Sequence, residues 1–165
     1  MEIRESKAGD VDAVFALYQR VAKTPGGLIR LADEVTPAYV AGFLERAAAA
    51  GLSLVALDAD QVIGEIHAYS PQLFALSHVW SELTIAIDPA AQGRGVGRAL
   101  FVEFMQRLRE RGDVDRLELI ARESNQRAIE FYESLGFRQE GRFESRIRNV
   151  DDSLEADIPM AWLRS

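Results

Sequence analysis

A glycine-rich segment between an apolar stretch and a long amphipathic stretch constrains this chain more than any other feature. Residues 83–87 read LTIAI, a pattern typical of a buried strand, and residues 92–97 read QGRGVG. A helical pattern of apolar residues follows, from about residue 95 to residue 111. Glycines let the backbone approach a ligand, and the first N–H groups of a helix are unpaired. With the helix dipole behind them, these donors favour a phosphate group; a turn that holds no ligand is the alternative.

The spacing of these glycines excludes two common phosphate-binding motifs. A Walker loop requires Lys and then Ser or Thr after its last glycine, but Gly97 is followed by Arg98 and Ala99. A dinucleotide fingerprint requires a glycine or alanine at a position that Arg98 or Leu100 occupies here. Neither nucleotide motif fits the segment.

The hydrophobic pattern divides the rest of the chain into strands and helices. Strands are predicted at residues 1–6, 52–57, 62–69, 80–87, 117–121, 137–148 and 154–163, and helices at residues 10–23, 37–50, 95–111 and 125–135. A run of antiparallel strands followed by one strand–helix–strand–helix unit indicates an α/β fold with a mixed, mostly antiparallel central sheet flanked by helices. With 165 residues and no linker, we expect one domain over residues 1–165.

Composition excludes several classes of function. The formal net charge of −7 argues against a nucleic-acid partner, because such proteins gather Lys and Arg against phosphates. The chain has no cysteine and two histidines, so we expect neither disulfides, nor a cysteine-bound acyl intermediate, nor a metal site. No apolar run approaches the ~20 residues that span a bilayer, and no secretory signal is present, so we expect a cytoplasmic protein without a membrane partner.

Two motifs in the expected order resemble the GNAT N-acetyltransferase superfamily. The first is Gln92, Gly95 and Gly97, at the junction of a strand and a helix, where the superfamily has its acetyl-CoA loop. The second is residues 125–137, NQRAIEFYESLGF, which is similar to the superfamily's helix and following strand. The resemblance implies the acyl-CoA N-acyltransferase fold, with acetyl-CoA as cosubstrate.

The resemblance also implies which residues contact acetyl-CoA. The pantetheine arm is expected between residues 85–87 and residues 120–121, and Asn125 is expected to hydrogen-bond the cosubstrate. The diphosphate is expected on the backbone N–H groups of the glycine loop. Together these expectations give the cosubstrate-binding set Ile85, Ala86, Ile87, Gln92, Gly93, Arg94, Gly95, Val96, Gly97, Arg98, Asn125 and Tyr132.

Three residues are candidates for the chemistry. Tyr132 matches the tyrosine that protonates the departing thiolate; packing against its helix neighbours is the alternative. Glu82 is the first candidate for the base that deprotonates the amine, and a bulge in its strand would absorb a one-residue offset from the superfamily pattern. His67 is the second candidate, as base or relay, with a structural role as the alternative. Glu65, on the same strand face as His67, either contacts substrate or pairs with an arginine.

The implied activity is transfer of an acetyl group to an amine of a small molecule or amino acid by direct attack on the thioester. Three alternatives stay open: transfer of an acyl group other than acetyl, acetylation of a protein N-terminus or lysine, and a non-catalytic module that senses CoA. A homodimer also stays open.

Overall fold

Eight strands form one sheet in the spatial order β1-β2-β3-β4-β5-β8-β6, and β7 also pairs with β8. The computed structural model describes residues 1–165. The strands are β1 (Glu2–Glu5), β2 (Gly51–Asp58), β3 (Gln61–Tyr69), β4 (Val79–Ile87), β5 (Arg116–Arg122), β6 (Arg138–Gln139), β7 (Phe143–Arg148) and β8 (Leu154–Leu163). Every pairing is antiparallel except that of β4 with β5, which confirms the predicted mixed, mostly antiparallel sheet.

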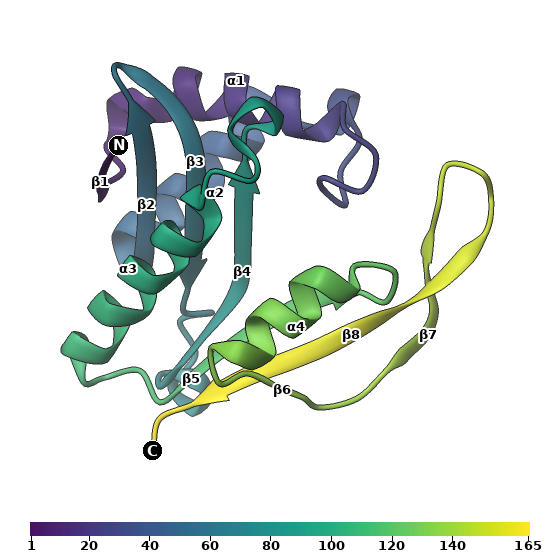
Figure 1. Ribbon diagram of the computed structural model, residues 1–165. Coiled ribbons are helices and arrows are strands. Elements are labelled where there is room, and N and C mark those ends of the chain that lie inside the picture. The colour runs from purple at the N-terminus through teal and green to yellow at the C-terminus, as the bar shows by residue number, and fades with distance from the viewer.

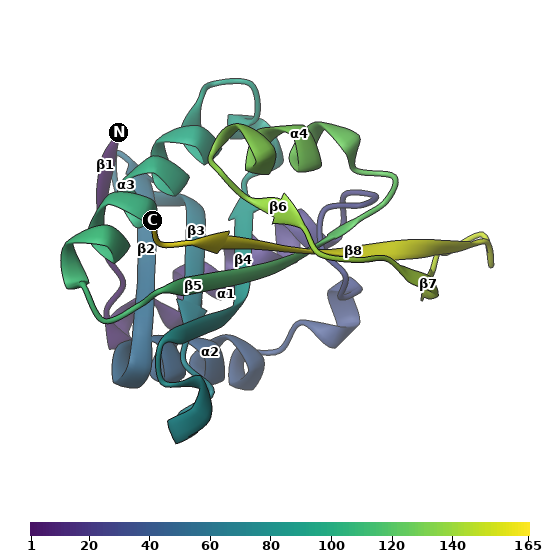
Figure 2. The ribbon, with the colours of Figure 1, turned by 90° about the horizontal axis from the view of Figure 1, so that it is seen from below.

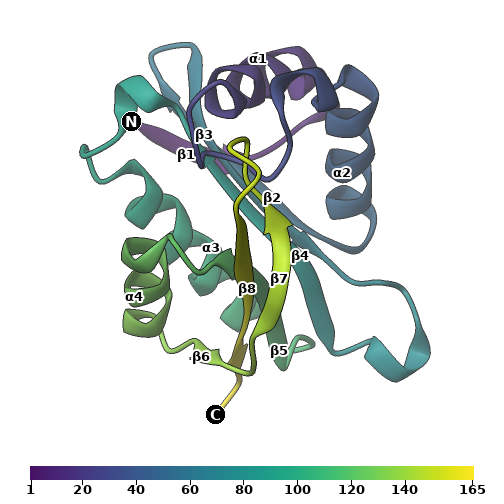
Figure 3. The same cartoon turned by 90° about the vertical axis from the view of Figure 1, so that its right-hand side faces the viewer.

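Four α-helices cover the two faces of this sheet. Helices α1 (Val11–Ala22) and α2 (Pro37–Ala50) lie on one face, and α3 (Val96–Arg111) and α4 (Gln126–Ser134) lie on the other (Figures 1 and 3). The four predicted helices are confirmed to within one residue at each end. No helix combines the length and the apolar character that crossing a membrane would require.

Local signals fix the ends of α2. The Thr36 hydroxyl accepts a hydrogen bond from the Tyr39 N–H at 3.1 Å, and Pro37 occupies the first turn, where its missing N–H costs nothing. On its inner side Phe43 packs against Tyr18 of α1, with ring centroids 5.1 Å apart, in the smaller of two apolar cores. The larger core lies under α3 and α4 and includes the fully buried rings of Phe101 and Phe104.

Strands β4 and β5 separate almost as soon as they meet. They pair at only two positions, Val79 with Arg116 and Trp80 with Leu117. From this junction β4 runs in one direction and the β5–β8 pair in another (Figures 1 and 2). Along the facing edges of β4 and β5, the backbone groups beyond the junction therefore have no strand partner.

Strand β4 contains the bulge that the sequence analysis invoked. His67 of β3 pairs with Thr84 and Tyr69 pairs with Ser81, so two residues of β4 stand opposite one residue of β3. One of the two is Glu82, whose φ is +59°. An L-residue adopts this left-handed conformation at a cost of about 1–2 kcal/mol.

The prediction of one strand over residues 137–148 is wrong, because the segment is split into β6 and β7. The break lies opposite Pro159 of β8, whose carbonyl accepts a hydrogen bond from the Glu140 N–H at 2.9 Å. In an extended strand the N–H and C=O of one residue point to the same side, so the N–H that Pro159 lacks would have faced this segment. The ladder is therefore interrupted there.

Candidate active site

A cleft of about 560 Å³ opens where β4 and β5 separate. This volume is within the range of small-molecule sites. Five segments line the cleft: Gly26–Ile29 from the α1–α2 loop, Ser81–Ile85 from β4, Glu118–Arg122 from β5, Asn125, Ala128 and Tyr132 at and within α4, and Arg146 and Asp157 from the β7–β8 hairpin.

The cleft connects the two faces of the sheet. Its α4 residues belong to the face that α3 and α4 cover, whereas the α1–α2 loop belongs to the opposite face. Because β4 and β5 are not paired here, one ligand can enter from each face and the two can meet between the strands. Such a site suits a reaction between two substrates.

The glycine loop continues from the far end of β4 and leads into α3. Gly93 and Gly95 have φ values of +76° and +78°, and a Cβ built on either would meet no protein atom within 4 Å. The first helical bond runs from the Ala99 N–H to the Gly95 carbonyl. The three preceding N–H groups, those of Val96, Gly97 and Arg98, therefore have no acceptor in the chain. The loop presents open donors beside open space, which fits a diphosphate.

The two arginines of the loop differ in their availability. The Arg94 guanidinium donates to Asp58 at 2.8 Å, and this contact lowers the pKa of the Asp58 carboxyl. Arg98 is exposed and forms no ion pair. Arg98 is thus the cation available to an anion at this end of α3.

The residues predicted to flank pantetheine lie on the open edges. Ile85 lines the cleft, whereas Ala86 is buried toward α1 and α2. Ile87 packs against Gly97, where a Cβ would lie 3.4 Å from the Ile87 side chain. Any contact that Ala86 makes with a ligand in the cleft must therefore come from its backbone.

Asn125 and Tyr132 meet the cleft from α4. The Asn125 side-chain oxygen Oδ1 accepts a hydrogen bond from the Ala128 N–H at 3.2 Å and caps the helix, which leaves the side-chain Nδ2–H groups of Asn125 free. Tyr132 packs against Phe101 with ring centroids 5.5 Å apart. Both of the readings of Tyr132 thus have a structural basis, since its ring packs in the core while its side chain borders the cleft.

The Tyr132 hydroxyl is not sealed in the core. It forms no hydrogen bond in the chain, yet every fully buried side-chain nitrogen or oxygen has a partner. The hydroxyl must therefore be accessible. Burial of the ring raises the pKa of Tyr132 to about 12, so the phenol keeps its proton at neutral pH.

Glu82 also borders the cleft. Its side chain is exposed and its carboxylate forms no ion pair, while its carbonyl accepts a hydrogen bond from the Thr84 hydroxyl at 3.1 Å. The bulge places an unpaired carboxylate on the wall of the cleft.

His67 lies outside the lining of the cleft. Its Nδ1 is 3.0 Å from the Glu65 carboxylate, and its ring stacks on Phe43 with centroids 4.0 Å apart. Glu65 is fully buried and pairs with no arginine; it accepts hydrogen bonds from the Tyr18 hydroxyl at 2.6 Å and the Ser53 hydroxyl at 2.8 Å. The structure does not bring His67 or Glu65 together with Glu82 and Tyr132.

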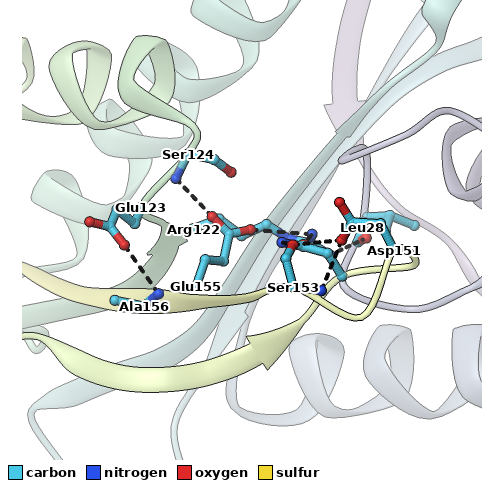
Figure 4. A network of polar contacts seen from close by, with 9 residues as sticks. Leu28, Arg122, Glu123, Ser124, Asp151, Ser153, Glu155 and Ala156 are labelled. Atoms are coloured by element: carbon cyan, nitrogen blue, oxygen red, sulfur yellow. Dashed lines mark hydrogen bonds and ion pairs between the residues drawn. The ribbon is translucent and has the colours of Figure 1, made fainter.

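The sequence analysis missed the wall on the side of α1 and α2. There Arg122 of β5 joins three segments: it donates to the Leu28 carbonyl and to the Asn149 side chain, each at 3.2 Å, and lies 3.6 Å from Glu155 (Figure 4). Asp157 and Arg146 complete this wall. The only sequence signal for Asp157 is that it alternates with apolar residues along its strand, which indicates that it points to the other face of the sheet.

Comparison with known proteins adds a family to this geometry. The model of the Acetyltransferase (GNAT) family matches residues 17–137. A mycothiol acetyltransferase from Beutenbergia cavernae is 51% identical over 53 residues, which are 32% of this chain and 18% of that protein. The [ribosomal protein bS18]-alanine N-acetyltransferase of Escherichia coli is 49% identical over 55 residues, or 33% of this chain and 36% of that protein. The chain thus matches only a minor part of each of these two relatives.

Solved structures share the fold. A phosphinothricin acetyltransferase from Sinorhizobium meliloti, in complex with AcCoA, superposes with a TM-score of 0.85 at 20% identity. The match covers 98% of this chain and 87% of that one.

Proposed function

Because the chain belongs to the GNAT family of acetyltransferases, we propose that it transfers the acetyl group of acetyl-CoA to an amine of a small molecule or amino acid. The observation that carries this proposal is the separation of β4 from β5 beside the glycine loop. An extended arm between the strands can pair with both open edges, and a diphosphate can bind the open N–H groups at the start of α3.

The residues of the cleft have the functional groups that acyl transfer requires. An ammonium cannot attack a thioester, so Glu82 removes one proton from the amine first. Backbone N–H groups on the open edge of β4 donate to the carbonyl oxygen as negative charge develops on it. The C–N bond forms and the C–S bond breaks, and Tyr132 donates its phenolic proton to the departing sulfur. The second proton of the reacting nitrogen restores the phenol, and Glu82 returns its proton to water.

A screen of acceptors tests the proposal. The protein is incubated with acetyl-CoA and a panel of amines, amino acids and one peptide with an N-terminal alanine, and release of the CoA thiol is measured. We expect thiol release that depends on one class of small acceptor. Release with the peptide alone would support the protein-acetylating alternative. Tight acetyl-CoA binding without thiol release from any acceptor would support the non-catalytic module.

A further inference from the structure

The cleft holds a buried carboxylate that has no hydrogen-bond donor. The side chain of Asp157 is 6% exposed, and neither of its oxygens accepts a hydrogen bond in the chain. Since no fully buried polar side-chain atom lacks a partner, these oxygens must open to a space, and Asp157 lines the cleft. A buried carboxylate with open acceptor sites is costly unless a ligand supplies donors.

The strand register places Asp157 on the side of the cleft away from α3 and α4. Its neighbours in β8, Ala156 and Ile158, belong to the core under α3 and α4. Side chains alternate along a strand, so Asp157 points to the opposite face, as does Arg122, its partner in β5. That face borders the α1–α2 loop. Asp157 therefore faces the side from which a second substrate can meet acetyl-CoA.

Two arginines flank Asp157, and only one of them is free. The Arg122 guanidinium is bound to Leu28, Asn149 and Glu155 (Figure 4). The Arg146 guanidinium forms no hydrogen bond; it lies 5.0 Å from the centre of the Phe143 ring, its Nη1 is 3.8 Å from the Asp157 carboxylate, and its side chain is 50% exposed. On this wall of the cleft, the Asp157 carboxylate and the Arg146 guanidinium thus lie side by side, each with unused hydrogen-bonding capacity.

This pair selects the charge of its ligand. A simple cation is attracted by Asp157 and repelled by Arg146, whereas a simple anion is attracted by Arg146 and repelled by Asp157. A molecule that carries an ammonium and a carboxylate on one carbon satisfies both groups, and Arg146 can bind a carboxylate through two parallel N–H donors. The exposed apolar surface of Ile29, on the same wall, is available to the rest of such a molecule.

We propose that Asp157 and Arg146 recognise the acceptor, which is an amino acid in its zwitterionic form. Asp157 binds the ammonium and Arg146 binds the carboxylate. This inference rests on the proposed acetyl transfer and deepens it, because it names the acceptor class and two specificity-determining residues. Removal of the proton stays with Glu82 of β4, which lines the same cleft.

Three acceptors that differ by one group test the assignment: leucine, leucinamide and 3-methylbutylamine. For the unmodified protein we expect kcat/KM to be highest with leucine. Arg146→Gln should lower kcat/KM for leucine by roughly 10- to 100-fold, mainly through KM, and leave 3-methylbutylamine nearly unchanged. Asp157→Asn should raise KM for all three acceptors. Arg148→Gln is the matched control, because Arg148 lies in the same strand and pairs with Asp152 outside the cleft.

Each outcome bears on the proposal. If the unmodified protein uses leucine and 3-methylbutylamine equally well, or if Arg146→Gln lowers both to the same extent, the acceptor is not recognised by its carboxylate and the inference fails while acetyl transfer stands. If both variants keep full activity and only unfold at a lower temperature, the pair is structural and the inference also fails. Absence of thiol release with every acceptor overturns the proposed function itself.

Discussion

The glycine at the start of α3 offers the sharpest test of where acetyl-CoA binds. Gly95 caps the N-terminal end of α3 and Gly112 caps the C-terminal end, with φ values of +78° and +74°. A Cβ on either glycine would meet no protein atom within 4 Å. Gly95→Ala and Gly112→Ala therefore impose the same backbone strain on one helix, but only the first places a methyl group where we propose the diphosphate.

The two variants should share one effect and differ in another. An alanine in the left-handed conformation costs about 1–2 kcal/mol, of which the stiffer unfolded chain returns about 0.4–1 kcal/mol. Both variants should then lose roughly 1 kcal/mol of unfolding free energy, measured in urea. A hydrogen bond to a charged group contributes about 1.5–3 kcal/mol, so loss of one phosphate contact weakens binding roughly 10- to 100-fold.

Calorimetric titration with acetyl-CoA separates the two effects. We expect the affinity of Gly112→Ala to match that of the unmodified protein and the affinity of Gly95→Ala to fall. Equal affinities for the two variants would refute the assignment of the diphosphate to this loop, whether both are unchanged or both are weakened.

Four further predictions concern single side chains. Tyr132→Phe should lower turnover by ~10²–10⁴-fold in single-turnover assays, with unchanged acetyl-CoA affinity, because it removes the proton donor. Glu82→Gln should abolish the rising limb of the pH–rate profile, which His67→Gln should leave in place. Glu82→Gly should raise the unfolding free energy by about 1 kcal/mol, because glycine tolerates the positive φ of this position. Tyr18→Phe should lower the unfolding free energy by about 1–3 kcal/mol, because buried Glu65 loses its hydrogen bond from the Tyr18 hydroxyl.

Three of these predictions have an internal control. The Tyr132 hydroxyl has no partner in the chain, so Tyr132→Phe should leave the unfolding free energy nearly unchanged, unlike Tyr18→Phe. Equal changes in the two variants would show that the hydrogen bond from Tyr18 to Glu65 does not stabilise the protein. Unaltered turnover in Tyr132→Phe would return Tyr132 to a packing role. If the rising limb of the pH–rate profile disappears only in His67→Gln, His67 is the base. If the rising limb persists in both variants, it reports deprotonation of the substrate amine.

Elements with strong local signals could be predicted from the sequence, and elements decided by other strands could not. The ends of α2 follow from Thr36, Pro37 and Gly51, all within or beside the helix. The split between β6 and β7 depends on Pro159, which lies in another strand and leaves no mark on residues 137–148 themselves.

The candidate site divides in the same way. The glycine loop and the start of α4 are contiguous in sequence, so their motifs indicate a ligand without a structure. The wall formed by Arg122, Arg146 and Asp157 depends on which face of β8 borders the cleft, and that face is set by the separation of β4 from β5. Burial likewise determines the roles of His67 and Glu65. The sequence places both residues on one face of a strand, but it cannot show that Phe43 packs on His67 and that Tyr18 binds Glu65.

The junction of β4 with β5 also has a consequence for the lifetime of the folded chain. Only the pairs at Val79 and Trp80 join strands β1–β4 to the β5–β8 part of the sheet, so few backbone hydrogen bonds hold the two parts together. Amide hydrogens near the gap should therefore exchange with solvent through local opening. A cosubstrate that pairs with both edges becomes an added strand for part of every catalytic cycle. At a concentration 100 times its Kd, such a ligand stabilises the native state by about 2.7 kcal/mol, a sizeable share of the 5–15 kcal/mol typical of whole domains. The supply of acetyl-CoA would then govern how long each molecule resists proteolysis, as well as how fast it turns over.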